Sequence, residues 1–261
     1  MSYPFLKGHG TENDFVVLPD PDGTVHGDLP ADRVRALCDR RAGIGGDGVL
    51  RAVREDGGWF MDYRNADGSV SEMCGNGVRV FARYLHEREG EGFPMRISTR
   101  AGVKVLDRTG EDYTADMGRP EVLGETEVSV MGRTWPAVHV SMGNPHAVAY
   151  VENLAEPGPL LEPPEHDDGV YPEGVNVEFV VRRGEHHVAM RVHERGSGET
   201  RSCGTGACAV AVATALADDA PRGTTYRVDL PGGTLHVVWT EDDRVLMTGP
   251  AVLVAEGVTD L

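Results

Sequence analysis

Cysteine is scarce in this sequence, which has four in 261 residues, at positions 38, 74, 203 and 208. Four cysteines in a chain of this length are too few for a disulfide-dense scaffold. No pair has C-x2-C spacing and no two histidines have H-x3-H spacing. A structural zinc site and a dedicated redox motif are therefore both disfavoured, and we expect no metal and free thiols. Oxidation that joins Cys74 to Cys203 remains open.

Long apolar runs are also missing. The longest apolar stretch, residues 207–217, includes Thr214. It is shorter than the roughly 20 residues that cross a bilayer. The first residues lack a basic segment followed by an apolar one, so we expect no signal peptide. These absences predict a soluble, cytoplasmic protein.

Positive charge is the third deficit, since 25 Lys and Arg stand against 42 Asp and Glu, a formal net charge of -17. A strongly acidic chain repels phosphate backbones and anionic lipid, which disfavours nucleic-acid and membrane partners. The glycine-rich residues 43–48 follow a helical pattern rather than a strand and do not match the G-x-G-x-x-G fingerprint of dinucleotide sites. With 40% hydrophobic residues, the composition is otherwise that of a globular protein.

One phrase occurs twice. Cys74 opens a Cys-Gly-x-Gly turn that follows Met61 by 13 residues, and Cys203 opens another that follows Met190 by the same 13. Asn13, Arg96, Gly102 and Gly118 have counterparts 131 residues later. Such self-similarity indicates a tandem duplication. We predict two halves, residues 1–130 and 131–261, each of ordinary domain size.

Strand patterns dominate each half. We predict strands at residues 14–18, 96–98, 138–141, 177–181, 187–192 and 234–239. Helical periodicity is confined to residues 30–41, 77–87 and 207–217, of which the last is apolar on every face and therefore expected to be buried all round. The prediction is an α/β (α+β) protein of two pseudo-symmetric, β-rich, barrel-like domains, each wrapped around a central helix. The functional site is then expected in the cleft between them.

The repeated cysteines are placed for chemistry. A helix N-terminus offers unpaired N–H groups and a partial positive charge, which favour a thiolate and bind carboxylates. Cys74 and Cys203 are therefore candidates for base or nucleophile, whereas Cys38 and Cys208 lie on apolar helix faces and are interpreted as structural. Two thiols on opposite faces of one carbon can remove a proton from one side and add one to the other. The expected outcome is inversion of a stereocentre.

Six linked motifs carry a family resemblance, at residues 9–15 (HGTENDF), 65–69 (NADGS), 73–77 (MCGNG), 142–146 (MGNPH), 194–200 (ERGSGET) and 203–206 (CGTG). In this order and spanning both halves, they resemble the signatures of the diaminopimelate epimerases. The resemblance implies a cofactor-independent interconversion of LL- and meso-2,6-diaminopimelate in lysine and peptidoglycan biosynthesis. It implies that Cys74 and Cys203 are the two catalytic bases.

The same resemblance assigns the other site residues. Gly75, Asn76, Gly204 and Thr205 match the residues whose amides hold the reacting carboxylate. His146 and Glu194 match residues that tune the thiols and meet the reacting amine. The distal end of the substrate is expected to meet a polar set: Asn13, Asn65, Asn144, Asn176 and Arg195. Two positions depart from the family pattern, because Gly48 stands where a substrate-facing glutamine is frequent and Glu12 where glycine is more usual.

Two alternatives stay open. A proline or hydroxyproline racemase shares the duplicated fold and two thiols, but there a histidine is expected where this chain has Asn76. A binding protein that has kept the fold and lost catalysis is the other alternative, although both thiols, His146 and Glu194 are retained. The sequence does not determine the oligomeric state, and a homodimer is one assembly that it allows.

Overall fold

The computed structural model describes residues 2–261, which contain three helices and eighteen strands. The chain folds into two compact units. The first comprises the chain up to Ala115 together with Gly249–Leu261, and the second is Asp116–Thr248. Each unit is described by itself below.

The first unit is built on a twisted sheet whose strands pair in the order β18-β1-β2-β3-β4-β5-β6-β7. The strands are β1 (Tyr3–Gly10), β2 (Asn13–Pro19), β3 (Gly48–Glu55), β4 (Gly58–Asn65), β5 (Met95–Thr99), β6 (Gly102–Thr109), β7 (Asp112–Gly118) and β18 (Val252–Thr259). The β2–β3 and β4–β5 pairs are parallel and the others antiparallel.

The second unit repeats this pattern in the order β8-β9-β10-β12-β13-β15-β16-β17. Its strands are β8 (Glu121–Val130), β9 (Arg133–Ser141), β10 (Pro145–Tyr150), β12 (Asn176–Gly184), β13 (His187–Glu194), β15 (Thr225–Leu230), β16 (Gly233–Trp239) and β17 (Val245–Pro250). Here β10–β12 and β13–β15 are the parallel pairs, at the same two places in the order. Two short strands, β11 (Glu165–His166) and β14 (Gly198–Thr200), pair with β8 and β13.

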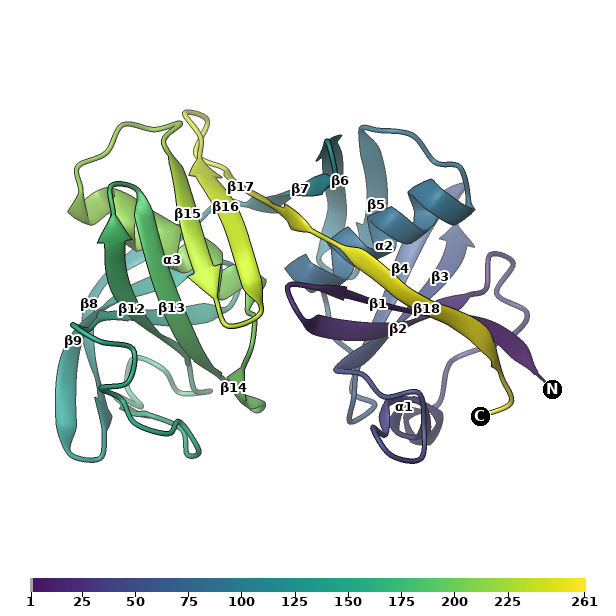
Figure 1. Ribbon diagram of the computed structural model, residues 1–261, viewed down its shortest axis with the longest axis horizontal. Coiled ribbons are helices and arrows are strands. Elements are labelled where there is room, and N and C mark those ends of the chain that lie inside the picture. Colours follow the sequence, from purple (N-terminus) through teal and green to yellow (C-terminus); the bar gives the residue numbers. More distant parts are fainter. Residues whose placement is uncertain (1) are drawn as a thin grey trace. The chain divides into compact units, whose positions relative to one another are not determined.

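Identical pairing orders bear out the predicted pseudo-symmetric, β-rich fold. The units nevertheless differ in extent from the halves at residues 1–130 and 131–261. Strand β18 pairs with β1, so the C-terminal segment completes the first sheet (Figure 1), and β8, which begins before residue 131, pairs with β9 in the second. The physical reason is that β1 would otherwise be an open sheet edge with unpaired backbone groups. The sequence halves stay a prediction about the duplication itself.

A central helix packs against each sheet. Helix α2 (Gly75–Arg88) lies against β1, β2 and β18 and buries its face through Val78, Phe81 and Leu85, the three positions that its periodicity predicts. Helix α3 (Gly204–Ala217) lies against β15, β16 and β10, with most of its residues buried, as its uniformly apolar sequence predicts. Both helices begin two to three residues before the predicted limits, because the glycines after each cysteine already have helical conformation.

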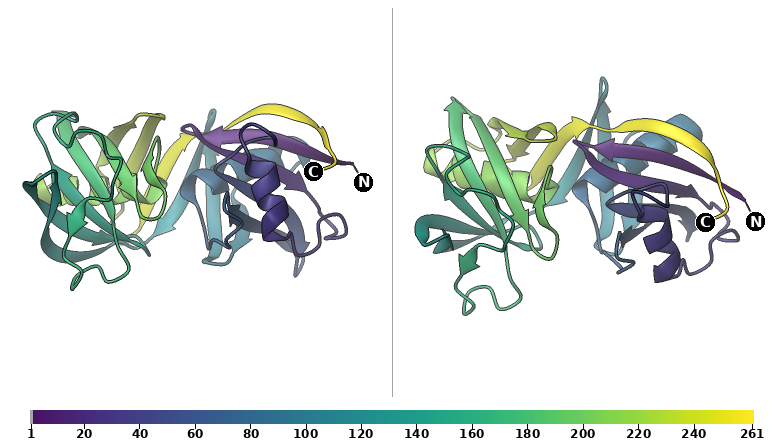
Figure 2. Two further views of the ribbon diagram at one scale, coloured as in Figure 1. Left: turned by 90° about the horizontal axis from the view of Figure 1, so that it is seen from below. Right: turned by 60° about the horizontal axis from the view of Figure 1, so that its bottom comes forward.

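The opposite face of each sheet is covered differently. In the first unit helix α1 (Ala31–Cys38) packs outside the sheet (Figure 2), where Val34 and Leu37 meet Val16 and Leu18 of β2. In the second unit the irregular chain between β10 and β12 covers the corresponding face with Leu160, Tyr171 and Val175. The predicted helix at residues 30–41 is shorter in the structure, since residues 39–45 form a turn in which Gly43 N–H is bonded to Asp39 O at 3.0 Å. Among residues 2–261, no helix has the length and apolarity needed to cross a membrane.

Candidate functional site

Cys74 caps the N-terminus of α2. Its backbone is extended, and its Sγ accepts a hydrogen bond from Gly77 N–H at 3.4 Å. A side-chain acceptor that satisfies one of the first N–H groups is the standard N-cap arrangement, here made with sulfur. A Cβ at position 77 would stand 3.3 Å from Leu50, 3.4 Å from Cys74 and 3.5 Å from Phe15, so the helix start packs closely on these side chains.

Polar side chains lie on one side of the Cys74 thiol. Cys74 Sγ lies 3.5 Å from Asn13 Oδ1, which also accepts from Asn76 Nδ2 at 3.3 Å. Asn76 Oδ1 in turn accepts from Arg79 Nη2 at 2.9 Å, and Arg79 Nη1 donates to Gly75 O at 3.1 Å. The structure therefore gathers the predicted residues Asn13, Cys74, Gly75 and Asn76 at one helix end. Because Asn13 turns a carbonyl oxygen toward the sulfur, it accepts from a thiol.

Cys203 caps α3 in the same way, with Sγ accepting from Gly206 N–H at 3.4 Å. Its Sγ lies 3.5 Å from Thr205 Oγ1, and Asn144 Nδ2 donates to the same hydroxyl at 3.4 Å. Asn144 belongs to the turn before β10, in the motif of residues 142–146. The second unit thus brings together the predicted residues Asn144, Cys203, Gly204 and Thr205.

Behind Cys203 lies a buried acid–imidazole pair. His146 Nδ1 is 2.7 Å from Glu178 Oε1, and His146 Nε2 is 3.1 Å from Asn144 Oδ1. Both side chains have no solvent exposure. A Cβ at Gly206 would stand 2.6 Å from Glu178 Oε1, so the carboxyl lies directly beneath the first turn of α3. The predicted link between His146 and the Cys203 site is therefore made through Asn144.

The pKa of the Cys203 thiol is raised well above its ordinary value. Burial is the main cause, and the carboxylates of Glu194 and Glu178 raise the pKa further, while hydrogen bonds from Thr205 and Gly206 oppose them. A lowered pKa, expected from the helix N-terminus alone, is wrong for Cys203, because desolvation of the thiolate outweighs the helix end. Burial likewise raises the pKa of Glu178 and raises that of Cys38 to about 11.

Asn176 and Arg195, predicted to bind the distal end of a substrate, are joined to each other. Asn176 is buried, its Oδ1 accepts from Arg195 N–H at 3.0 Å, and its Nδ2 donates to Pro145 O at 2.9 Å. The Arg195 guanidinium donates to Glu173 O at 3.2 Å and lies 3.7 Å from the Glu173 carboxylate. The amide therefore positions the backbone that carries the arginine. Next to it, Glu194 accepts a hydrogen bond from the Thr200 hydroxyl.

The structure gives a reason for one of the two departures from the family pattern, Gly48, and none for Glu12. Gly48 pairs with Asn65, and a Cβ there would stand 2.5 Å from Arg64 O and 2.7 Å from the Tyr63 ring, so a glutamine does not fit without a shift. Asn65 itself donates to Ser69 Oγ at 3.0 Å within a turn. Glu12 lies in the two-residue turn between β1 and β2 with φ 63°, a left-handed conformation that favours glycine.

Sequence reasoning missed two buried ionisable groups next to the thiols. Glu178 is a lone carboxyl between Val177 and Phe179, and Arg79 is a lone guanidinium between Val78 and Val80. Both are fully buried. A charged residue inside an otherwise apolar strand or helix is rarely buried unless paired, and this pattern was the signal available in the sequence.

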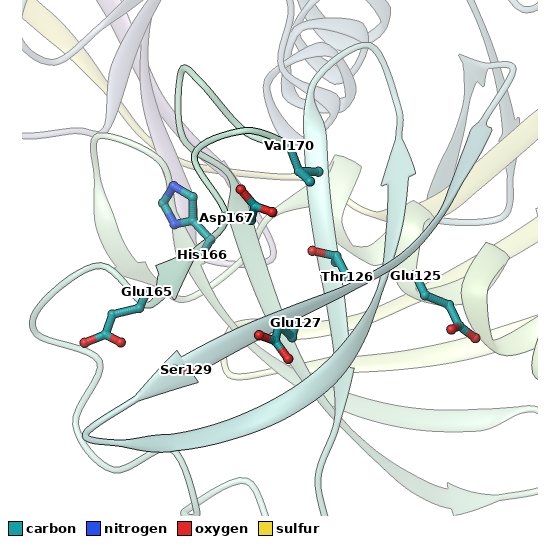
Figure 3. A pocket seen from close by; sticks show the side chains of 8 residues that line it. All are labelled: Glu125, Thr126, Glu127, Ser129, Glu165, His166, Asp167 and Val170. Atoms are coloured by element: carbon teal, nitrogen blue, oxygen red, sulfur yellow. The ribbon is translucent and has the colours of Figure 1, made fainter.

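A hollow of about 610 Å³ in the second unit lies apart from these residues. Figure 3 shows it between β8 and the segment after β11, with the side chains of Glu125, Glu127, Glu165 and Asp167 around it. No predicted site residue lines it among the described residues. Within residues 2–261 no three His, Cys, Asp or Glu side chains are grouped to hold a metal ion.

The fold of this chain, a duplicated sheet with a central helix in each unit, is shared by solved structures. A PhzF family phenazine biosynthesis protein from Bacillus anthracis matches with a TM-score of 0.74 at 17% identity, over 100% of both chains. A predicted epimerase from Pseudomonas aeruginosa matches with a TM-score of 0.72 at 17% identity, over 99% of both chains. A probable proline racemase from Agrobacterium radiobacter gives 0.67 at 15% identity, over 99% of this chain and 92% of that one. At these identities the likeness concerns the fold alone.

The family is decided by sequence. The diaminopimelate epimerase family model matches residues 5–123 and 138–254. The diaminopimelate epimerase of Streptomyces coelicolor is 59% identical, with 98% of this chain and 95% of that protein covered. That of Thermobifida fusca is 46% identical, with 97% and 96% covered. The chain belongs to the diaminopimelate epimerase family, a family of isomerases, which confirms the resemblance seen in its motifs.

Proposed function

We propose that this chain interconverts LL- and meso-2,6-diaminopimelate with two thiols and no cofactor. The observation that carries the proposal is the equivalence of Cys74 and Cys203, each the N-cap of the central helix of its unit. Both are followed by Gly-x-Gly, so backbone N–H groups of each helix start can approach a substrate carboxylate. The reaction requires this pair on opposite faces of one carbon.

The chemical step moves one proton off the α-carbon and another onto it. One cysteine as thiolate removes the α-proton, and the electron pair left behind spreads into the adjacent carboxylate. N–H groups at the starts of α2 and α3 stabilise this growing charge, because they are oriented before the reaction. The other cysteine, as thiol, then donates its proton to the opposite face. After one turnover the two sulfurs have exchanged protonation states, and the reverse reaction uses them in opposite roles.

The remaining roles follow from the family motifs. The reacting carboxylate is assigned to Gly75, Asn76, Gly204 and Thr205. The reacting amine is assigned to Glu194, with His146 acting on the thiol through its neighbours. The distal amino acid group is assigned to Asn13, Asn65, Asn144, Asn176 and Arg195, because guanidinium grips carboxylate with two parallel hydrogen bonds and amides orient both charged groups.

Substrate binding also supplies the activation that Cys203 lacks when the protein is free. Glu194 is one of the carboxylates that raise the pKa of Cys203. A substrate ammonium beside Glu194 would neutralise that charge and add a positive one, and both effects lower the thiol pKa. The thiolate is then favoured where substrate is bound, which protects a reactive sulfur from other electrophiles.

Two other functions are less well supported. A proline racemase is favoured only by likeness of fold, which is a weak indication of activity, and a single amino acid would leave Arg195 without a distal carboxylate. An inactive binding protein would not need both thiols with helix-capping geometry. The epimerase is therefore the better supported function.

The test is exchange of the α-proton of LL-diaminopimelate in deuterated water, followed by NMR. Wild type should incorporate deuterium and form meso product. Cys74→Ala and Cys203→Ala should each abolish epimerisation with an unchanged circular dichroism spectrum, since one thiol serves only one face. Cys208→Ala, a buried cysteine within α3, is the matched control and should remain active. Near-normal turnover by either capping-cysteine variant would contradict the two-base mechanism.

Assembly and location complete the proposal. A cytoplasmic homodimer is consistent with a biosynthetic enzyme that depends on free thiols. Analytical ultracentrifugation under reducing conditions distinguishes a dimer from a monomer of 28.1 kDa.

A further inference from the structure

Different side chains lie beneath the two thiols. Beneath Cys74 lie Phe15 and Leu50, whose side chains come within 3.5 Å of a Cβ built at Gly77. Beneath Cys203 the corresponding contact at Gly206 is made by Glu178. The strand register makes the correspondence explicit. Leu50 pairs with Val17 between β3 and β2, and Glu178 pairs with Val148 between β12 and β10, in the same parallel pairing of each unit.

Hydrogen-bond roles around His146 follow from the acceptors that it meets. Asn144 Oδ1 can only accept, so Nε2 at 3.1 Å must carry a proton. Nδ1 and Glu178 Oε1, 2.7 Å apart, must then share one proton, held either by the imidazole or by the carboxyl. If that shared proton were lost, the ring would hold its one remaining proton on Nδ1, facing the carboxylate, and Nε2 would have no hydrogen to donate to Asn144. Glu178 and His146 together therefore hold one proton more than a carboxylate and a neutral imidazole would.

The surroundings of Glu178 favour keeping that proton. The carboxyl is fully buried, and no hydrogen-bond partner for its second oxygen, Oε2, occurs in the described chain. Burial raises its pKa, and the charge of Glu194 raises it further. The other titratable groups nearby are Cys203, His139 and Tyr171. Burial and His146 lower the pKa of His139, and burial raises that of Tyr171 to about 12, so neither adds a charge near neutral pH.

We infer that Glu178 is a positioning residue for Cys203, because the proton it shares with His146 sets the direction of a hydrogen-bond chain that ends at the thiol. His146 Nε2–H donates to Asn144 Oδ1, which leaves Asn144 Nδ2 to donate to Thr205 Oγ1 at 3.4 Å. The Thr205 hydroxyl, whose acceptor side is occupied by this amide, is free to donate to Cys203 Sγ at 3.5 Å when a thiolate forms.

Loss of Glu178 should leave the direction of the chain unfixed. Without a partner at Nδ1, both neutral tautomers of His146 are open; with the proton on Nδ1, Asn144 turns its NH₂ group toward Nε2 and its oxygen toward Thr205. The hydroxyl is drawn to Asn144 and can only accept from a Cys203 thiol, which disfavours the thiolate. At the Cys74 site, Asn13 Oδ1 faces the sulfur directly, and Leu50 stands at the position equivalent to Glu178. The device therefore acts on one thiol of the two.

The inference rests on the proposed function, but its test needs no substrate. The rate of iodoacetamide alkylation of Cys203 and Cys74 is measured against pH in the full chain by peptide mass mapping. Glu178→Leu, which copies Leu50 of the first unit, and Glu178→Gln both remove the carboxylate that raises the pKa of Cys203, but only glutamine can still donate to Nδ1. Cys203 should therefore react about tenfold more slowly near neutral pH in Glu178→Leu than in Glu178→Gln, the effect of losing a hydrogen bond to a charged group. Cys74 should keep its wild-type profile in both.

The control variant is Asp229→Asn. It alters another His–carboxylate pair of the same unit, His187 Nε2 with Asp229 Oδ2 at 2.7 Å, which is not part of the hydrogen-bond chain that leads to Cys203. It should leave both cysteine profiles unchanged. Equal Cys203 profiles in folded Glu178→Leu and Glu178→Gln proteins, or equal slowing of Cys74, overturn the inference. If Glu178→Leu does not fold, ¹⁵N NMR of histidine in the wild type decides. The His146 signal, identified by its loss in His146→Phe, should show protonated Nε2, and an unprotonated Nε2 overturns the inference.

The two hypotheses can fail separately. If diaminopimelate shows no α-proton exchange in wild type while the alkylation result holds, Glu178 still positions Cys203, and only the substrate assignment is lost. If exchange occurs and Glu178→Leu alkylates like Glu178→Gln, the epimerase stands without this positioning role.

Discussion

Phe15 and His146 occupy the same register position of the two units. Phe15 pairs with Gly48 between β2 and β3, and His146 pairs with Asn176 between β10 and β12. Both side chains are fully buried. The backbone duplication is therefore close to symmetric, whereas the equivalent side chains differ, with Phe15 and Leu50 in one unit and His146 and Glu178 in the other. Racemisation of a substrate with a single stereocentre does not require such a difference. A substrate with a second, fixed stereocentre at its distal end presents different surroundings on the two faces of its reacting carbon.

Oxidation tests whether the two thiols share one site. If Cys74 and Cys203 face the same substrate carbon, mild oxidation should inactivate the enzyme by joining them, and dithiothreitol should restore activity. Peptide mapping after oxidation identifies the bridged cysteines. A disulfide that involves Cys38 or Cys208 instead would mean that the proposed bases do not share a site.

Arg195 should matter more than Asn176 for catalysis on diaminopimelate. Arg195→Met removes a charge-assisted pair of hydrogen bonds and leaves a substrate carboxylate desolvated, at a cost of about 2–5 kcal/mol in kcat/KM. Asn176→Ala removes neutral hydrogen bonds, each about 0.5–1.5 kcal/mol. Because Asn176 also holds the Arg195 backbone, its loss should lower thermal stability as well. Small, equal losses of kcat/KM in both variants, or turnover of proline by wild type, would favour a smaller substrate.

His26 should make the first unit sensitive to acid. Its ring is buried against Tyr3 at a centroid distance of 4.6 Å, and neither ring nitrogen has a hydrogen-bond partner among the described residues. Burial, with Arg33 nearby, lowers its pKa from 6.5 to about 4. The unfolded chain binds the proton more readily, so stability is complete above pH 6.5 and falls as the pH drops toward 4, by roughly 3 kcal/mol at most.

His26→Phe should therefore flatten the urea-unfolding free energy between pH 4 and pH 6.5. His236→Gln, at an exposed strand position, serves as control and should keep the wild-type slope. A slope that survives in His26→Phe would assign the acid sensitivity to another group.

Glu12→Gly should stabilise the protein. Glu12 has φ 63°, and a non-glycine residue in the left-handed region costs roughly 1–2 kcal/mol, of which the extra freedom of glycine in the unfolded chain returns about half. The expected gain of about 0.5–1 kcal/mol corresponds to a rise in Tm of about 2 °C. Glu125→Gly, in strand β8, should instead lower Tm. A fall in Tm for Glu12→Gly would show that the turn bears no strain at this residue.

The sequence alone determined the features that depend on local pattern. Helix α2 was predictable because Val78, Phe81 and Leu85 recur at helical spacing, and α3 because an unbroken apolar segment can only be buried. The capping positions of Cys74 and Cys203 followed from the glycines after them, and the motifs identified the family. Each of these inferences uses residues within one turn or one strand of each other, where covalent spacing restricts the geometry.

Tertiary structure decided what depends on residues far apart in the chain. That β18 pairs with β1 could not be read from periodicity, because an edge strand and its partner carry no mutual sequence signal. The raised pKa of Cys203 came from burial and from Glu194 and Glu178, which converge on the helix start from strands 9 and 25 residues away. His146 and Glu178, 32 residues apart in sequence, share a proton only because β10 and β12 run parallel at this register. The local sequence determines which side chains lie near a helix end. Only long-range packing determines how far those side chains are removed from water and which partners decide their protonation.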